Sequence, residues 1–161
     1  MLDQTSIGLT LTILLKHDNL FDSGADALVN AVNCVGVMGG GIALEFKNRY
    51  PEMFRQYALY CERGFFRPGV VMTYQHDDGK YVINYPTKDD WRNPSKLSYV
   101  IKGFDSLLIR VKNFDIKSVA IPALGCGLGG LDWNEVRPIL YALDEEMPEV
   151  TWMIYPPQGV K

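Results

Sequence analysis

Hydrophobic and polar residues follow two different spacings along this chain, one typical of strands and one typical of helices. At positions 9–15, Thr10 and Thr12 alternate with apolar residues, which is the two-residue period of a strand with one buried face. The runs ALVNAV (27–32) and SVAIPAL (118–124) are almost wholly apolar, as expected of strands that are covered on both faces. The pattern therefore predicts strands at 9–15, 27–32, 70–74, 80–85, 118–121 and 150–155.

Helical spacing is clearest over positions 95–113. The apolar side chains there recur at steps of three and one, which places them on one face of a helix: Leu97, Val100, Ile101, Phe104, Leu107, Leu108 and Val111. Asn93 is suited to cap this helix, and Pro94 is suited to its first position. The sequence therefore predicts a long amphipathic helix here, with Ser95 in its first turn.

Two shorter helices are indicated by their end signals. One is predicted at 51–63, where Gly64 ends it, and another begins at the D-x-x-E pattern of Asp132 and Glu135. Because strands and helices alternate along the chain, we expect an α/β fold in layers with a mixed sheet.

The composition excludes several classes of protein. The length of 161 residues predicts one domain over 1–161. A net charge of -3 argues against nonspecific binding to a long polyanion, although a local basic groove is compatible with it. Three cysteines without a C-x-x-C spacing argue against a disulfide framework, and two distant histidines argue against a zinc cluster, so we expect no metal.

Nothing in the hydropathy pattern indicates a membrane protein. The longest apolar runs are too short to span a bilayer, and the N-terminal stretch lacks the basic region and cleavage site of a signal peptide. We therefore expect a cytoplasmic protein without a membrane partner.

Two glycine-rich segments share one design. NAVNCVGVMGGGIA (30–43) and PALGCGLGGLDWNEV (122–136) each follow an apolar strand and lead into a helix. Ligands of open α/β sheets bind where such loops enter helix N-termini, and glycine lets main-chain N–H groups approach anionic oxygens. Neither segment is a Walker A loop or a Rossmann fingerprint. The pair predicts a site in which the two loops face each other across a diphosphate.

Each of these features also has a purely structural interpretation. A glycine cluster usually only supplies a turn, but two clusters at corresponding strand ends favour a ligand site. Asn30 and Asn33, at the end of the strand predicted at 27–32, either bind sugar hydroxyl groups or close Asx turns.

Together, the stretches DALVNAVN, GVMGGGIALEFKNRYP and IPALGCGLGGLDWNEV resemble the macrodomain family, and most closely the macrodomains of the DarG antitoxins. The resemblance covers nearly the whole chain. It implies a three-layer α/β/α sandwich with a mixed, mostly parallel sheet, and it implies ADP-ribose as the ligand. It also implies an ADP-ribosyl glycohydrolase that removes ADP-ribose from modified thymidine in single-stranded DNA without a cofactor, opposed to a DarT-type toxin.

The same resemblance assigns the ligand contacts. Asp18 corresponds to the acid that accepts a hydrogen bond from the adenine amino group, and Asn33 to the residue that contacts the distal ribose. Tyr155 matches an aromatic position near the adenine, although the sequence is equally compatible with an aromatic residue in the core. The two glycine loops contribute Gly39, Gly40, Gly41, Ile42, Gly125, Cys126, Gly127, Leu128, Gly129 and Gly130.

Catalysis is assigned by the resemblance to Lys88, which follows Thr87 in the segment INYPTKDDWRNPS. If the resemblance is left aside, the sequence predicts that Lys88 is a solvent-exposed lysine in a loop. Its amine, if neutral, attacks the anomeric carbon; if charged, it stabilises negative charge on the leaving thymine. Asp89 and Asp90 favour the charged form, provided that their side chains turn toward it.

One position departs from the family pattern. The related human hydrolase that acts on glutamate esters pairs its lysine with an aspartate, which corresponds to Gly129 here. Hydrolysis of glutamate esters is therefore not expected. The nearby Asp132 is either a helix N-cap or a replacement acid.

Trp91 and Arg92 follow Lys88 and suit contact with a neighbouring nucleotide, by stacking and by charge. Alternatively, Trp91 anchors its loop to the core. Two rival functions stay open at this stage, namely a binding module that recognises ADP-ribose without turnover and an ADP-ribose 1''-phosphate phosphatase.

Overall fold

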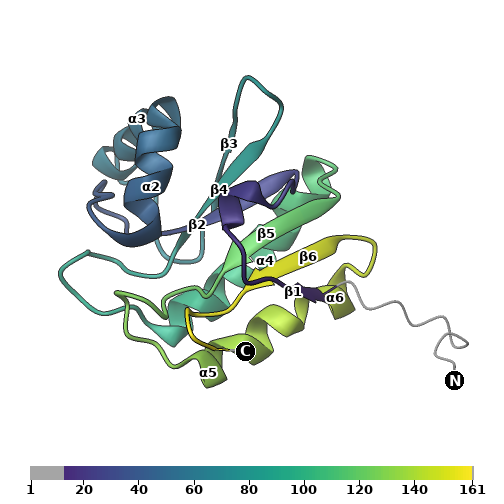
Figure 1. The fold of residues 1–161 in the computed structure, drawn as a ribbon. Helices are drawn as coiled ribbons and strands as arrows, with labels where there is room; N and C mark the ends of the chain where they lie inside the picture. The colour runs from purple at the N-terminus through teal and green to yellow at the C-terminus, as the bar shows by residue number, and fades with distance from the viewer. Residues whose placement is uncertain (1–12, 161) are drawn as a thin grey trace, which may run out of the picture.

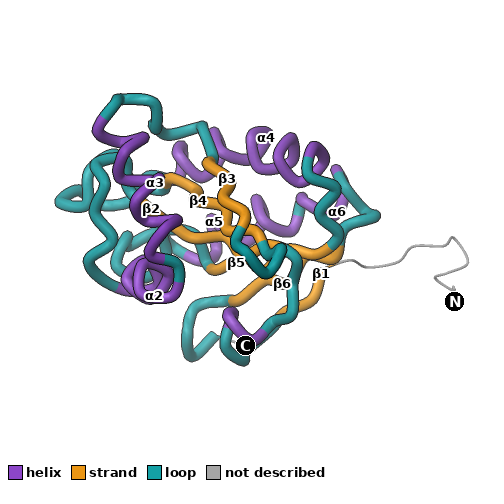
Figure 2. Tube along the Cα trace, turned by 90° about the horizontal axis from the view of Figure 1, so that it is seen from above, coloured by secondary structure: helices purple, strands orange, loops and turns teal. Residues whose placement is uncertain are grey.

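The computed structural model describes residues 13–160, which form a six-stranded sheet between two layers of helices (Figure 1). In the view of Figure 2 the strands run between helix α2 and helix α4. The elements in chain order are β1 (Ile13–Leu15), η1 (Leu20–Asp22), β2 (Ala27–Val32), α2 (Gly41–Arg49), α3 (Pro51–Glu62), β3 (Met72–Gln75), β4 (Tyr81–Pro86), α4 (Leu97–Asn113), β5 (Ser118–Pro122), α5 (Trp133–Tyr141), α6 (Leu143–Glu146) and β6 (Thr151–Tyr155).

The sheet is mixed and mostly parallel. Its strand order is β1-β6-β5-β2-β4-β3, and every neighbouring pair is parallel except β3 with β4. This confirms the expected α/β sandwich. Each of the six predicted strands is present, although positions 9–12 of the first lie outside the described residues.

Strand β2 shows how the sheet separates two cores. Successive side chains of a strand point to opposite faces. Ala27 and Val29 belong to a cluster with α4, α5 and α6, whereas Leu28 and Val32 belong to a cluster with α2 and α3. A strand buried on both faces is expected to be mostly apolar, which explains the run ALVNAV, in which Asn30 is the one polar residue.

Helix α4 begins later than its sequence pattern predicts. Asn93 is not its cap and Pro94 is not its first residue, because the helix starts at Leu97 and Lys96 takes the capping position in an extended conformation. The reason is tertiary. The N–H group of Ser95 donates to the carbonyl of Gly129 at 3.0 Å, and the N–H group of Lys96 donates to the carbonyl of Thr87 at 3.1 Å, so this segment is held extended.

The other two helix signals are confirmed. Helix α3 ends just before Gly64, whose φ of +72° is the left-handed conformation that glycine adopts readily. Asp132 caps α5, and its carboxylate accepts a hydrogen bond from the N–H group of Asn134 at 2.9 Å.

The strands β1, β6, β5, β2 and β4 are parallel, so their carboxyl ends meet at one edge of the sheet.

Candidate active site

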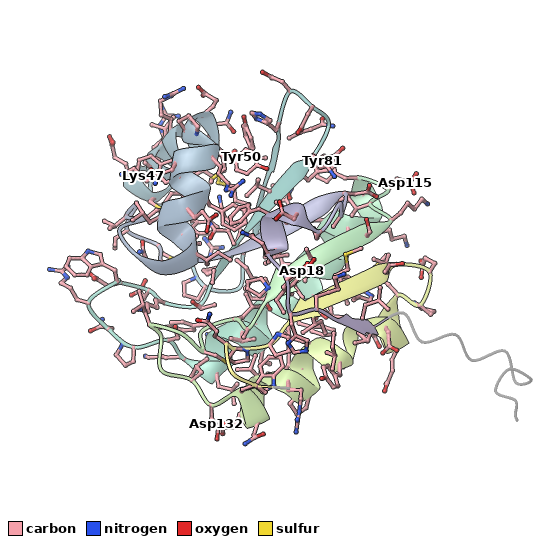
Figure 3. The ribbon with its side chains drawn as sticks, viewed as in Figure 1. Asp18, Lys47, Tyr50, Tyr81, Asp115 and Asp132 are labelled. Atoms are coloured by element: carbon pink, nitrogen blue, oxygen red, sulfur yellow. The ribbon has the colours of Figure 1, made fainter. Side chains whose placement is uncertain are left out.

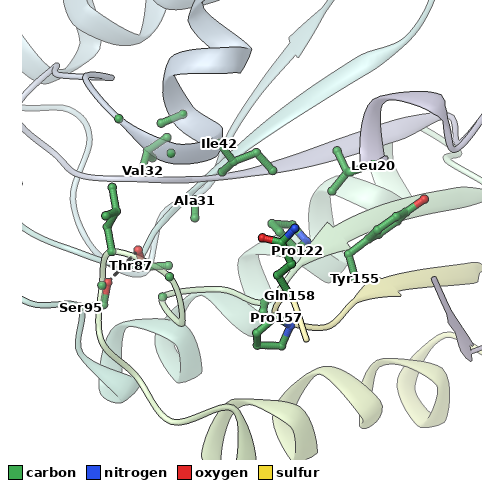
Figure 4. A pocket seen from close by; sticks show the side chains of 18 of the residues that line it. Leu20, Ala31, Val32, Ile42, Thr87, Ser95, Pro122, Tyr155, Pro157 and Gln158 are labelled. Carbon is green, nitrogen blue, oxygen red and sulfur yellow. Dashed lines mark hydrogen bonds between the residues drawn. The ribbon is translucent and has the colours of Figure 1, made fainter. Parts of the chain in front are cut away.

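A cleft of about 1200 Å³ lies at the edge of the sheet where the parallel strands end. It is lined by the loops that follow β1, β2, β4, β5 and β6, and by the start of α2. This volume suits a ligand of dinucleotide size. Figure 4 shows the cleft, with Thr87 and Ser95 toward one end and Tyr155 toward the other.

Most of the predicted site residues line this cleft. They are Asp18, Asn33, Gly39, Gly40, Gly41, Ile42, Lys88, Trp91, Gly125, Gly127, Leu128, Gly129 and Tyr155. Three do not belong to the lining. Cys126 donates its thiol to the carbonyl of Leu124 at 3.6 Å, Gly130 closes a turn onto Gly127, and Arg92 pairs with Asp90.

The first glycine loop presents bare main chain to the cleft. Gly40 is the N-cap of α2 and supplies no side-chain cap, so the first N–H groups of the helix have no partner from that residue. Such N–H groups carry a partial positive charge and suit an anion.

The second glycine loop approaches the first through Leu128. A methyl group added at Gly40 would lie 3.2 Å from Leu128 Cδ1, and one added at Gly41 would lie 3.4 Å from it. The Leu128 side chain is itself 79% exposed. The two loops therefore meet across the cleft, as their shared design predicts.

Asn33 closes the loop that follows β2. Its side-chain oxygen accepts from the N–H group of Val35 at 3.0 Å and from the hydroxyl of Tyr57 at 2.7 Å, and its amide donates to the carbonyl of Val37 at 2.7 Å. The Asx-turn interpretation is thus correct, and one amide N–H group is left for a ligand.

Asn30 has neither of the two roles considered for it. It is fully buried and donates to the side-chain oxygen of Asn84, its register partner on β4, at 3.1 Å. Its amide also lies 3.7 Å from the sulfur of Met38, a buried residue of the first glycine loop. Asn30 therefore contributes to the site indirectly, through its contact with Met38 of the first glycine loop.

Asp18 and Tyr155 stand at the same end of the cleft. The Asp18 carboxylate is 53% exposed and lies 3.9 Å from the Lys16 ammonium. The Tyr155 side chain is only 8% exposed, and its hydroxyl has no hydrogen-bond partner among residues 13–160. Burial, and then the charge of Asp18, raise the pKa of Tyr155 to about 12. Tyr155 packs in the core, as one interpretation predicts, and it also lines the cleft, while its place beside the adenine stays a prediction.

Lys88 reaches the other end of the cleft, just beyond β4. Its side chain is half-buried, and the carbonyl of its neighbour Asp89 accepts from the N–H group of Cys34 at 3.0 Å, which ties this loop to the end of β2. Over residues 13–160, neither Lys88 nor Asp89 forms an ion pair.

Asp90 turns toward Arg92. The guanidinium group of Arg92 donates to the two carboxylate oxygens of Asp90 at 2.9 Å and 2.5 Å, and these hydrogen bonds lower the pKa of Asp90 to about 2. The condition under which Asp90 would favour a charged Lys88 is therefore not met.

Trp91 does not anchor its loop to the core. Its side chain is 52% exposed and lines the cleft. The guanidinium carbon of Arg92 lies 5.7 Å from the centre of its ring. An exposed indole beside the cleft is available for stacking on a flat ligand group.

Comparison with known proteins identifies the family. Residues 29–140 match the family model of the Macro domain. The chain belongs to the macrodomain family. The DNA ADP-ribosyl glycohydrolase of Mycobacterium tuberculosis is 50% identical to it over 144 residues, which are 88% of this chain and 41% of that protein. The chain thus spans less than half the length of this relative.

Solved structures agree with this assignment. The macrodomain of Mycobacterium tuberculosis DarG matches with a TM-score of 0.88 at 46% identity, over 91% of this chain and 98% of that chain. The DarTG protein of Thermosipho africanus, solved in complex with ADP-ribose, matches with a TM-score of 0.87 at 30% identity, over 96% of this chain and 44% of that chain.

The second glycine loop of this macrodomain has no room for a side chain at Gly129. A methyl group there would overlap the hydroxyl oxygen of Ser95 and would lie 2.5 Å from the carbonyl oxygen of Gly125. Asp132 does not replace an acid at this point, because it caps α5, is exposed at the outer edge of the molecule (Figure 3) and does not line the cleft.

Two cleft residues of this macrodomain are absent from the site that the sequence predicts. The sequence assigns Thr87 no role beyond preceding Lys88, and its helical spacing predicts Ser95 in a helix, which instead begins at Leu97. Both are buried and line the cleft. The segment after β6 also contributes, with Pro156, Pro157, Gln158 and Gly159. No local pattern marks these residues, because they reach the cleft only through the strand order.

Residues 13–160 contain no group of three or more His, Cys, Asp or Glu side chains arranged to hold a metal ion. The three cysteines Cys34, Cys61 and Cys126 are free. Among the same residues, no helix has the length and the apolar character needed to cross a membrane.

Proposed function

We propose that this macrodomain binds ADP-ribose in the cleft and hydrolyses the N-glycosidic bond that joins ADP-ribose to a base in DNA. The observation that carries this proposal is the position of Lys88. Its half-buried side chain lines the same cleft as the two glycine loops and the open N-terminus of α2. A diphosphate held by these main-chain groups extends toward a cationic side chain at one end.

The relatives support the choice of substrate. The Mycobacterium tuberculosis relative is named a DNA ADP-ribosyl glycohydrolase, and the Thermosipho africanus structure contains ADP-ribose. Thymidine in single-stranded DNA as the modified group, a DarT-type toxin as its source and a cytoplasmic location stay predictions of the resemblance to DarG. We assign Trp91 to stacking on a base next to the modified one, since its ring is exposed beside the cleft.

In the proposed reaction, the bond between the anomeric carbon and the base nitrogen breaks, and its electron pair passes to the base. The oxygen of a water molecule bonds to the anomeric carbon, and one water proton ends on the base. Lys88 acts either as a neutral amine that forms a transient adduct or as a charge that stabilises the leaving base.

Replacing Lys88 tests the function. We expect Lys88→Ala to lower kcat for release of ADP-ribose from a modified oligonucleotide by about 100-fold or more, because a group that acts on the reacting bond is lost. The affinity for free ADP-ribose, measured by calorimetry, is expected to change only a few-fold. Lys96→Ala is the matched control, since Lys96 is exposed and does not line the cleft.

Lys88→Arg separates the two mechanisms. Arginine keeps the positive charge but does not lose its proton at neutral pH. A variant that retains most of the activity supports charge stabilisation, and one as inactive as Lys88→Ala supports the amine as nucleophile.

Two other outcomes favour the rival functions. Wild-type protein that binds ADP-ribose but never releases it from DNA is a binding module. Wild-type protein that releases phosphate from ADP-ribose 1''-phosphate, and no ADP-ribose from DNA, is a phosphatase.

A further inference from the structure

Two hydroxyl side chains that the proposed mechanism does not use form a buried pair in the cleft. Thr87 is 3% exposed and Ser95 is 6% exposed, and both line the cleft. Ser95 Oγ lies 3.3 Å from Thr87 Oγ1, within hydrogen-bonding distance (Figure 4). Thr87 directly precedes Lys88 in the chain.

Main-chain hydrogen bonds from three elements fix this pair. The N–H group of Thr87 donates to the carbonyl of Val32 at the end of β2 at 2.9 Å, and its carbonyl accepts from Lys96 at 3.1 Å. The N–H group of Ser95 donates to the carbonyl of Gly129 in the second glycine loop at 3.0 Å. The two hydroxyl groups are thus held in place by bonds that do not involve their side chains.

The pair has a hydrogen-bond donor to spare. Two hydroxyl groups carry two protons, and the bond between Thr87 and Ser95 uses one of them, whichever of the two donates. The other proton has no acceptor among the described residues. Because both residues line the cleft, this donor is available to a group bound there.

Ser95 also takes the space that a side chain at Gly129 would need. A methyl group at that position would overlap Ser95 Oγ, so the second glycine loop supplies main chain only at this point. The hydroxyl pair is therefore the polar group that this part of the cleft presents next to Lys88.

We propose that Thr87 is a second catalytic residue, whose hydroxyl donates a hydrogen bond to the departing base, and that Ser95 is the residue that positions it. This inference rests on the proposed glycohydrolase function. As the glycosidic bond breaks, its electron pair passes to the base, which becomes negative. Thr87 keeps its proton and stabilises this charge, while water supplies the proton that the base finally receives. A fixed donor in a water-poor site stabilises such charge without reorganising.

The test uses Thr87→Val, which keeps the shape of the side chain and removes the hydroxyl. We expect kcat for release of ADP-ribose from a modified oligonucleotide to fall by about 100-fold, the usual effect of losing one such donor. The affinity for free ADP-ribose should stay unchanged, because free ADP-ribose has no DNA base attached to the anomeric carbon of its distal ribose. Thr87→Ser should restore most of kcat, and Ser95→Ala should lower kcat less than Thr87→Val without changing KM.

A matched control is available on β3. The hydroxyl of Thr73 is buried and has no partner in the described part of the chain, and Thr73 does not line the cleft, so Thr73→Val should leave kcat unchanged. The double variant Thr87→Val with Ser95→Ala leaves no unpaired hydroxyl behind and should melt near the wild-type temperature. If this double variant melts normally but has a low kcat, the loss of activity comes from the missing hydroxyl groups and not from a folding defect.

Several results would overturn the proposal. A Thr87→Val variant with wild-type kcat, or one that loses ADP-ribose affinity as strongly as kcat, removes the assigned role. The same holds if Thr87→Ser is as inactive as Thr87→Val. If wild-type protein and Thr87→Val are both active on modified DNA, this inference alone is wrong. If wild-type protein is inactive on modified DNA, the proposed function is wrong and this inference with it.

Discussion

At the scale of single residues, the atoms around each glycine of the second glycine loop decide whether that position can accept a side chain. The space that a Cβ at Gly129 would need is already filled by the hydroxyl of Ser95 and the carbonyl of Gly125. Gly127, two positions earlier, has no atom within 4 Å of the place that its Cβ would take. Two glycines of one loop thus differ in what they tolerate.

We expect Gly129→Ala to lower the free energy of unfolding by about 1–3 kcal/mol, because the added methyl group forces main chain apart. Denaturant unfolding measures this change. Gly127→Ala is the control and should change stability by less than about 0.5 kcal/mol, as exposed substitutions do. Equal stability of the two variants would contradict the crowding around Gly129.

At the scale of elements, strands and helices largely follow their local patterns, and the exceptions lie at their ends. The α4 pattern includes Ser95 by periodicity, but the helix starts at Leu97 because Gly129 and Thr87 hold the preceding main chain in hydrogen bonds. An end that is set by distant partners is invisible to a local pattern. By contrast, the caps at Gly64 and Asp132 act within their own segments, and the sequence predicts both.

Replacing Asp132 tests whether this acidic residue only caps α5 or also takes part in catalysis. We expect Asp132→Ala to destabilise the protein by about 1 kcal/mol, the usual effect of losing an N-cap. Release of ADP-ribose from modified DNA should remain within about two-fold of wild type, since the carboxylate binds Asn134 and lies outside the cleft. A large fall in kcat at unchanged stability would instead make Asp132 the missing acid.

At the scale of the whole molecule, burial raises the pKa of several thiols and phenols together. The pKa of Cys34 rises to about 12, those of Cys61 and Cys126 to about 11, and that of Tyr155 to about 12, with desolvation as the main cause in each case. Their neutral forms are therefore favoured by folding.

This predicts a loss of stability in alkali. A group with a raised folded pKa contributes its full stabilisation below the unfolded pKa, and that stabilisation is lost as the pH rises from the unfolded to the folded value. For these thiols and phenols the window runs from about pH 9 to about pH 12. Melting temperatures between pH 7 and pH 11 should stay level and then fall above about pH 9. A melting temperature that is constant up to pH 11 would contradict this burial of ionisable groups.

The sequence by itself determined the strands, most of the helices and the two glycine loops, because periodicity and turn chemistry act over a few neighbouring residues. It indicated Lys88 only through the resemblance to the DarG macrodomains. Tertiary structure alone decided what those residues meet. It bound the side-chain oxygen of Asn33 to the hydroxyl of Tyr57 and buried Asn30 against Asn84. It also brought Thr87 and Ser95 together in the cleft. These contacts depend on the strand order and on main-chain hydrogen bonds between distant segments, which no local spacing records.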